Sequence, residues 1–343
     1  MIPTDELKLI TALKNLDSSL RGETFVLFNF NESTKHVLAT TATNREYYAK
    51  WEAFSAPSWL AYAEKFGLGI VVATEDLLPS GDSRYKNGAW QKMFLPTVLA
   101  KEVSSIQRVC LLDTDVVVSP RAPNIFQIAP EGEYSVVSQE KGLPFNVVEA
   151  RRRVAVQRNR HYSAEYPLDS LLLADAAEEF RQQGLPPKDD FFCSGVIVCD
   201  VSHAAQLREW FYSLDNAIEG HVVAWEQTHL NHWIQGEKHS WLPYQFQALW
   251  HYEMAWDHPH LYPLGEKLCE APETLSALTT ALWNNYFLHF AGSWHESLAW
   301  SVVPRLETLR IAKLFGEFDS YLGQRITPRN LGKIPPASSF SSS

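Results

Sequence analysis

The sequence predicts an α/β fold built on a mixed, mostly parallel sheet that is flanked by helices. Short apolar runs rich in β-branched residues alternate with longer segments in which apolar residues recur at three- and four-residue spacing. This alternation of strands and helices indicates parallel strands joined by crossover helices. The run RVCLLDTDVVV at 108–118 is almost continuously apolar before its two aspartates, as is typical of a strand buried on both faces of a parallel sheet.

The first half of the chain supplies three strands and two helical segments. We expect strands at 36–43 and 68–76, and a helix over 44–67 that Pro57 interrupts or restarts. A second helix at 89–104 leads into the strand that begins at residue 108. The order strand, helix, strand, helix, strand defines the predicted parallel sheet.

The second half is predicted to return to the sheet after an interruption. Residues 140–190 are polar and helical, and we interpret them as an insertion beside the sheet. A buried strand at 191–200 follows, and then come helices at 204–220 and 226–236, each of which ends on glycine.

Composition excludes several classes of function. The chain has 343 residues, 45% of them hydrophobic, and a formal net charge of -10, which disfavours nucleic-acid binding because that requires clustered basic residues. No apolar stretch is long enough for a transmembrane segment, and the N-terminus does not resemble a secretory signal. The four cysteines are widely spaced, which predicts reduced thiols and a cytoplasmic protein.

Two carboxylates mark the end of the third strand. Asp113 and Asp115 are two residues apart, so in extended geometry both side chains would project to the same side. Ligands of open α/β sheets bind where strands end. Two ionised carboxylates at this range repel each other unless a cation lies between them, and Mg²⁺ or Mn²⁺ prefers oxygen ligands. The pattern therefore predicts a divalent metal site.

Five sequence blocks in a fixed order resemble the glycogenin-like family of retaining GT-A glycosyltransferases. They are WQKMFLP, RVCLLDTDVVVSP, FFCSGVIVCD, EQTHLN and FLHFAG, which together span residues 90–292. The resemblance implies a GT-A (Rossmann-like) catalytic domain over about 35–300, preceded by an N-terminal segment, 1–34. A C-terminal helix and a disordered tail would occupy 301–343.

The resemblance also implies the chemistry. Asp113, Asp115 and His289 would bind Mn²⁺ or Mg²⁺, and this cation would hold the diphosphate of a nucleotide sugar, expected to be UDP-linked. Glu226 and Gln227 would face the donor sugar as the catalytic pair, with retention of configuration. The acceptor would be a glycan, a lipid or a small molecule. The other positions implied to contact the donor are Thr41, Thr43, Asn44, Tyr47, Lys92, Thr114, Ser194, Gly195 and Gly292.

Several of these residues have a plainer explanation. His289 could be a buried histidine bonded to a backbone carbonyl, and Lys92 could form a salt bridge on a helix surface. Asn44 could cap the helix that follows it, and Glu226 could interact with a helix N-terminus.

The sequence departs from the family pattern at two places. Cys193 replaces an amide that usually contacts the donor sugar, and no lysine follows His289, where the chain instead has Trp294 and His295. Two other classes of function therefore stay open: a nucleotidyltransferase on a related fold, and a non-catalytic sugar-binding or scaffold protein with a GT-A fold. The first is disfavoured because no glycine-rich phosphate loop is present.

Overall fold

The computed structural model describes residues 25–29, 33–102, 105–162, 174–215, 226–292 and 294–306. Its centre is a seven-stranded sheet with the order β1-β3-β2-β4-β7-β6-β8. The strands are β1 (Phe25–Phe28), β2 (His36–Thr41), β3 (Gly69–Ala73), β4 (Arg108–Leu112), β6 (Tyr134–Ser138), β7 (Phe192–Asp200) and β8 (His239–Leu242). Only β1 and β7 run opposite to the other strands. The predicted α/β class, with a mixed and mostly parallel sheet, is confirmed.

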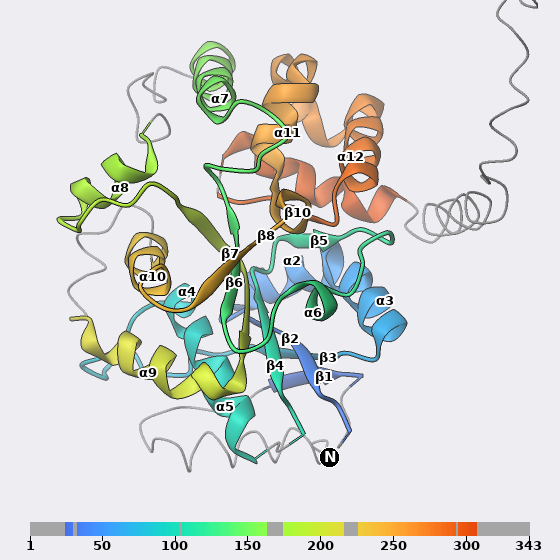
Figure 1. Ribbon diagram of the computed structural model, residues 1–343. Coiled ribbons are helices and arrows are strands. Elements are labelled where there is room, and N and C mark those ends of the chain that lie inside the picture. Colours follow the sequence, from blue (N-terminus) through green and yellow to red (C-terminus); the bar gives the residue numbers. More distant parts are fainter. Residues whose placement is uncertain are drawn as a thin grey trace, which may run out of the picture.

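Helices cover both faces of this sheet (Figure 1). One face carries α2 (Arg45–Phe54), α3 (Ala56–Phe66) and α6 (Ile125–Ile128), and the other carries α4 (Gly88–Gln91), η1 (Lys92–Phe94), α5 (Leu95–Glu102), η3 (Val201–His203), α9 (Ala204–Ser213) and α10 (Gln227–Ile234). Alternate side chains of β4 divide between the two faces: Val109 and Leu111 pack in the core with α5 and α9, whereas Cys110 and Leu112 pack with α2 and α3. This two-sided burial explains why β4 is apolar throughout.

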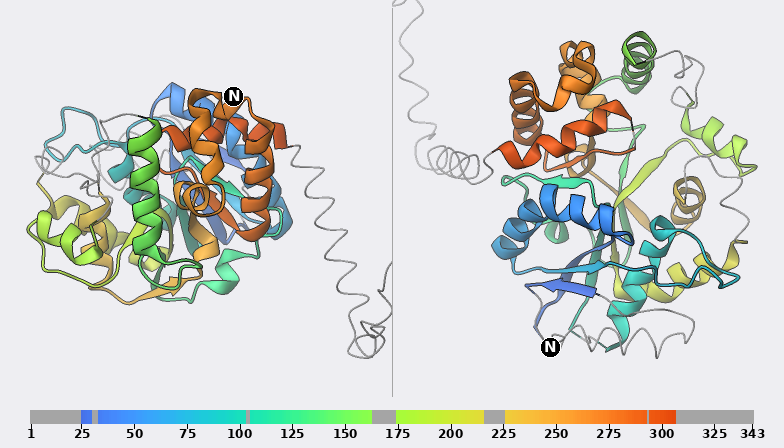
Figure 2. Two further views of the ribbon diagram at one scale, coloured as in Figure 1. Left: turned by 90° about the horizontal axis from the view of Figure 1, so that it is seen from above. Right: turned by 180° about the vertical axis from the view of Figure 1, so that it is seen from behind.

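A second group of elements packs at one end of the sheet around its own core (Figures 1 and 2). It contains a three-stranded sheet of order β5-β10-β9. The elements are β5 (Val116–Val118), α7 (Val147–His161), η5 (Tyr244–Gln247), β9 (Ala248–Leu249), α11 (Trp250–Asp257), η6 (Pro259–Cys269), α12 (Pro272–Asn284), β10 (Phe287–His289) and η7 (His295–Leu306). Helix α8 (Ala176–Gln182) lies between β6 and β7 in the chain, as α7 does.

The third strand ends at the two aspartates, as predicted, but the residues around them form a turn and not the extended geometry that we expected. The chain leaves the large sheet after Leu112, turns through Asp113–Asp115 and enters the small sheet as β5. The Val116 amide donates to the Asp113 carbonyl at 3.2 Å, which closes the turn. Helix α3 holds the redirected strand, because the Trp59 indole donates to the Val116 carbonyl at 2.7 Å. The two aspartates therefore lie on a turn between two sheets and not along one strand.

Several predicted boundaries are confirmed. Pro57 restarts the helix, because it lies at the first turn of α3 after a break at Ser55. The predicted strand at 191–200 is β7, and it runs antiparallel to both of its neighbours. β1 lies within the segment 1–34 and pairs with β3. The C-terminal tail predicted beyond residue 306 lies outside the described residues.

A buried carboxyl group joins three elements of the second core. Glu253 of α11 accepts hydrogen bonds from the Tyr244 hydroxyl at 2.9 Å and from the Asn285 amide at 3.1 Å. Burial is the main cause that raises the pKa of Glu253 to about 7. The folded protein therefore holds a proton that the unfolded chain releases above pH 4.5 or so.

The raised pKa of Glu253 predicts that the free energy of unfolding depends on pH. Because the folded-state pKa is the higher one, the Glu253 contribution to the free energy of unfolding falls as pH rises through the window between the two pKa values. Between pH 5 and pH 8 this contribution should fall by about 2 to 3 kcal/mol. Urea unfolding of wild type and Glu253→Gln at both pH values checks it, and the variant should lack that part of the decline. Parallel pH profiles of the two proteins would contradict it.

Candidate metal and donor site

The predicted site residues converge at one edge of the large sheet. Strands β2, β4, β6 and β8 all end at this edge, and β7 begins there because it runs in the opposite direction. The edge therefore gathers the turn after β4, the first residues of β7 and the loop after β2. Such an edge is where open α/β sheets bind ligands.

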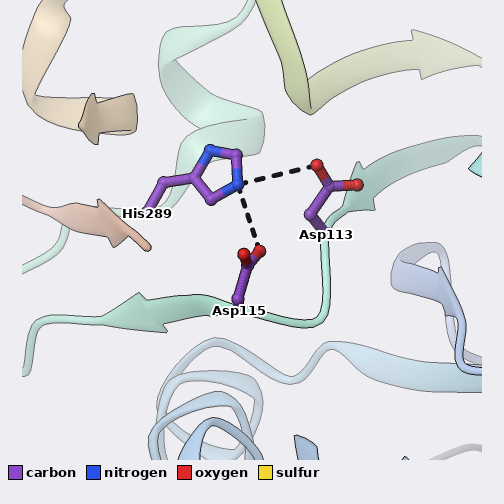
Figure 3. A group of neighbouring side chains, drawn as sticks. All are labelled: Asp113, Asp115 and His289. Atoms are coloured by element: carbon purple, nitrogen blue, oxygen red, sulfur yellow. Dashed lines mark ion pairs between the residues drawn. The ribbon is translucent and has the colours of Figure 1, made fainter. Parts of the chain in front are cut away.

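Asp113, Asp115 and His289 meet at this edge (Figure 3). Strand β10 pairs with β5 so that His289 lies opposite Val116, and the Phe290 amide donates to the Asp115 carbonyl at 3.1 Å. This pairing places Nε2 of the imidazole 3.1 Å from Oδ1 of Asp115 and 3.6 Å from Oδ2 of Asp113. The side chain of His289 is only 2% exposed, whereas those of Asp113 and Asp115 are 33% and 21% exposed.

The arrangement fits a divalent cation. One ligand atom from each of the three residues lies within 4.8 Å of the others, and no other such group of three or more occurs among the described residues. Neighbouring ligands of an octahedral ion with bonds of about 2.1 Å lie roughly 3 Å apart. Two carboxylates with one imidazole suit Mn²⁺, which accepts both oxygen and nitrogen ligands.

Gly195 makes room for the imidazole. A Cβ atom at this position would lie 2.6 Å from Nδ1 of His289, would overlap the ring carbon Cε1 and would lie 2.7 Å from the Gln247 amide nitrogen. The resemblance implies that Gly195 contacts the donor. The structure adds a second role, because only glycine allows His289 to reach the aspartates.

Electrostatic interactions among these side chains shift their pKa values. Burial alone would lower the pKa of His289, but the Asp115 carboxylate outweighs it and raises the pKa well above its ordinary value. Burial would raise the pKa of Asp113, but Lys92 and His289 outweigh it and lower the pKa. Both shifts show that the two carboxylates favour positive charge at this point, which is where a divalent cation would bind.

Lys92 does not lie on a helix surface, so that alternative is wrong. Its side chain is 1% exposed, and its ammonium group forms an ion pair with Asp113 and donates to the Ser194 carbonyl at 3.0 Å. Burial lowers the pKa of Lys92, but the carboxylates of Asp113 and Glu226 more than offset this and raise it. Lys92 is therefore a buried, charged neighbour of the aspartate pair.

Helix α10 holds the first residues of β7 in position. Asn231 bonds both backbone groups of Phe192, at 2.7 Å and 2.6 Å. The Gln227 side chain accepts from the Ser194 amide at 3.2 Å, and the Glu226 carboxylate accepts from the Ser194 hydroxyl at 2.7 Å. Glu226 is 3% exposed, whereas Gln227 is half-buried, so Gln227 is the more accessible of the pair.

Four predicted residues lie from the end of β2 to the first turn of α2. The Asn44 side chain caps α2 by accepting from the Tyr47 amide at 2.8 Å, so its capping role is confirmed. The Thr41 hydroxyl donates to the Gly88 carbonyl at 2.8 Å, and a Cβ at Gly88 would lie 2.5 Å from the Thr43 hydroxyl oxygen. Tyr47 is 55% exposed. Within the described part of the chain, no hydrogen bond or ion pair joins these side chains to Asp113, Asp115 or His289.

The remaining predicted residues lie close to the aspartates in the chain or the fold. Thr114 is the half-buried centre of the turn between β4 and β5. Gly292 has a positive φ of 85°, and a Cβ there would lie 2.8 Å from the Trp294 ring. Cys193, which departs from the family pattern, places its sulfur 3.6 Å from Nδ1 of His289. Side chains therefore contact both ring nitrogens of His289: Cys193 lies near Nδ1, and the two aspartates lie near Nε2.

Gln247 was missed by sequence reasoning. It is fully buried at the end of η5, and its amide nitrogen lies 3.2 Å from Nδ1 of His289. It belongs to none of the five matching blocks, and a glutamine before a short apolar pair carries no recognisable signal. Its place beside His289 depends on the pairing of β9 with β10, in which Leu249 lies opposite His289.

Comparisons with known proteins add a general likeness. No protein-family model matches the sequence, and no curated protein matches it. A glycosyltransferase involved in glycosylation of the major capsid of PBCV-1 is similar in structure, with a TM-score of 0.45 and 11% identity over 79% of this chain and 99% of that one. The bifunctional glycosyltransferase WbbM, in its apo form, has a TM-score of 0.43 and 13% identity. That comparison covers 83% of this chain and 52% of WbbM, so the present chain spans about half of that protein.

Within the residues that the structure describes, no helix has both the length and the apolar character needed to cross a membrane.

Proposed function

We propose that this protein is a metal-dependent glycosyltransferase that takes a sugar from a nucleotide-sugar donor. The observation that carries the proposal is the meeting of Asp113, Asp115 and His289 at the ligand-binding edge of the sheet. The glycogenin-like blocks favour a UDP-linked donor, Mn²⁺ as the ion and retention of configuration. Each of these three statements depends on the sequence resemblance.

We assign each group of site residues a separate role in binding the donor. Asp113, Asp115 and His289 would hold the cation, which when bound would neutralise the negative charge that develops on the departing diphosphate. Lys92, paired with Asp113, keeps a second positive charge beside the leaving group. Ser194 and Gly195 form the wall of β7 against which the donor would rest. Thr41, Thr43, Asn44 and Tyr47 lie where the nucleoside would sit.

Gln227 is proposed as the group that faces the donor sugar, and Glu226 as a positioning residue behind it. Glu226 is buried and already accepts from the Ser194 hydroxyl, so its carboxylate stabilises Ser194 and Lys92. Gln227 is the more exposed of the two, and its side-chain oxygen, which accepts from the Ser194 amide, has a second lone pair that would face a cationic anomeric carbon.

Replacing Gln227 with alanine should therefore slow catalysis more than it weakens donor binding. We expect kcat for donor hydrolysis to fall roughly a hundredfold, with the affinity for UDP and Mn²⁺ nearly unchanged, because the amide would act mainly on the transition state. Steady-state kinetics together with calorimetry separate the two quantities. A variant that binds UDP poorly but keeps its kcat would contradict this role.

The acceptor would approach from the far side of β7. A hollow of about 400 Å³ lies at the ends of β6 and β8, and Ser138, Asp190 and Trp241 are among the residues that line it. Trp241 is 38% exposed, and an aromatic face beside polar groups is typical of carbohydrate sites.

Calorimetric titration of UDP, with and without Mn²⁺, tests the proposal. Wild type should bind UDP only with Mn²⁺, and Asp115→Ala should not bind it. Metal-dependent hydrolysis of UDP-sugars without acceptor would then distinguish an enzyme from a sugar-binding scaffold. Formation of pyrophosphate from a nucleoside triphosphate would instead indicate a nucleotidyltransferase. Absence of UDP binding in both conditions would contradict the proposed donor.

A further inference from the structure

The proposed role of His289 requires a particular tautomer. Nε2 faces the two aspartates, and it can bind a cation only through its lone pair. The ring proton must then be on Nδ1, and a buried N–H without an acceptor is costly. The groups around Nδ1 therefore decide whether the imidazole is ready to bind a metal.

Two side chains contact Nδ1. The Gln247 amide nitrogen lies at 3.2 Å and the Cys193 sulfur at 3.6 Å. A thiol is a weak acceptor, whereas an amide carbonyl is a strong one. Gln247 is fully buried, and its Oε1 has no hydrogen-bond partner among the described residues. Gly195 leaves the space in which the amide and the ring meet.

The orientation of the Gln247 amide follows from the proton on Nδ1. If the amide nitrogen of Gln247 faces Nδ1, it donates a hydrogen bond to Nδ1. The ring proton of a neutral His289 would then be on Nε2, and Nε2 could not bind a metal. A half-turn about the Cγ–Cδ bond exchanges oxygen and nitrogen without moving other atoms, and the two are not distinguished by shape. One polar atom of the amide lacks a partner in either orientation, so the proton on Nδ1 decides between them.

We propose that Gln247 is a positioning residue of the metal site. Its side-chain carbonyl accepts a hydrogen bond from Nδ1–H of His289 and holds the imidazole in the tautomer that presents Nε2 to a divalent cation. This inference rests on the proposed metal site. It adds a buried hydrogen-bond partner of the kind that fixes metal-binding histidines in other proteins.

Mn²⁺ affinity in the presence of UDP tests the inference. The free ion is measured by its electron paramagnetic resonance signal in wild type, Gln247→Met and Gln247→Glu. Methionine has a similar shape but cannot accept strongly, so its affinity should fall roughly 10- to 100-fold. Glutamate can accept from Nδ1–H, so Gln247→Glu should keep the wild-type affinity or exceed it. Gln245→Met, two residues earlier in η5, is the matched control and should bind Mn²⁺ as wild type does.

The outcomes separate this inference from the function on which it rests. A folded Gln247→Met variant with wild-type affinity would overturn it, since packing alone would then suffice. An equal loss in Gln247→Met and Gln247→Glu would also overturn it, because an acceptor would not have rescued the site. If wild type itself binds no Mn²⁺ with UDP, the proposed metal site fails, and this inference fails with it. Thermal unfolding of each variant shows whether a loss reflects the site or the fold.

Discussion

Asp115→Asn should lower metal-dependent hydrolysis of the nucleotide-sugar donor roughly a thousandfold, because a bound cation contributes several kcal/mol of charge stabilisation to the transition state. The substitution keeps the size of the side chain and removes its charge. It replaces one of two anionic ligands with a neutral amide and removes the negative charge that lies 3.1 Å from Nε2 of His289. The rate is measured with saturating Mn²⁺, so that weakened binding of the metal can be separated from slower chemistry.

Asp189→Asn is the matched control for the loss of a carboxylate charge. Its side chain is 92% exposed and pairs only with Lys141 on the surface among the ion pairs of the described residues. The control should leave hydrolysis unchanged. If Asp115→Asn kept most of its activity while the fold remained intact, catalysis would not depend on a cation at this turn.

Gly195→Ala should remove metal binding almost as completely, although it changes no ligand. The added methyl would overlap the imidazole of His289, so the ring or β7 must shift. The backbone at Gly195 has little freedom on the β4 side, because the Asp113 amide donates to the Gly195 carbonyl at 3.0 Å. A misplacement of about 1 Å costs roughly a hundredfold in rate, and overpacking costs about 1 to 3 kcal/mol of stability.

Gly81→Ala provides the comparison for this prediction. A Cβ at Gly81 meets no atom within 4 Å, so the same chemical change should alter neither Mn²⁺ affinity nor activity. Calorimetry of Mn²⁺ with UDP and thermal unfolding are run on both variants. Wild-type Mn²⁺ affinity in Gly195→Ala would show that His289 is not a ligand or that β7 moves freely.

Much of the sheet could be predicted because its strands are apolar on both faces. β2, β3, β4 and β7 lie where the sequence indicated, and the predicted alternation with helices is confirmed. The end of β4 at the two aspartates was predicted, but the entry of VVV into a second sheet could not be, since this segment is as apolar as the strand before it. What separates them is tertiary: Trp59 bonds the Val116 carbonyl, and β10 pairs with β5.

The site shows a similar division. The order of the motifs predicted that Asp113, Asp115 and His289 form one site, and the three side chains lie close together in the structure. The resemblance placed Lys92 near the donor, but its burial and its ion pair with Asp113 could not be predicted, because a lysine on a helix is usually exposed. Gln247 had no signal at all, since its position beside His289 depends on a pairing of two short strands that no local pattern specifies.

X-ray diffraction from crystals grown with MnCl₂ and UDP, recorded for the anomalous signal of manganese, tests the central claim most directly. The claim predicts a single strong manganese peak in contact with Asp113, Asp115 and Nε2 of His289, and bound to the diphosphate. Ordered UDP at the edge of the sheet with no manganese between these three side chains would contradict it.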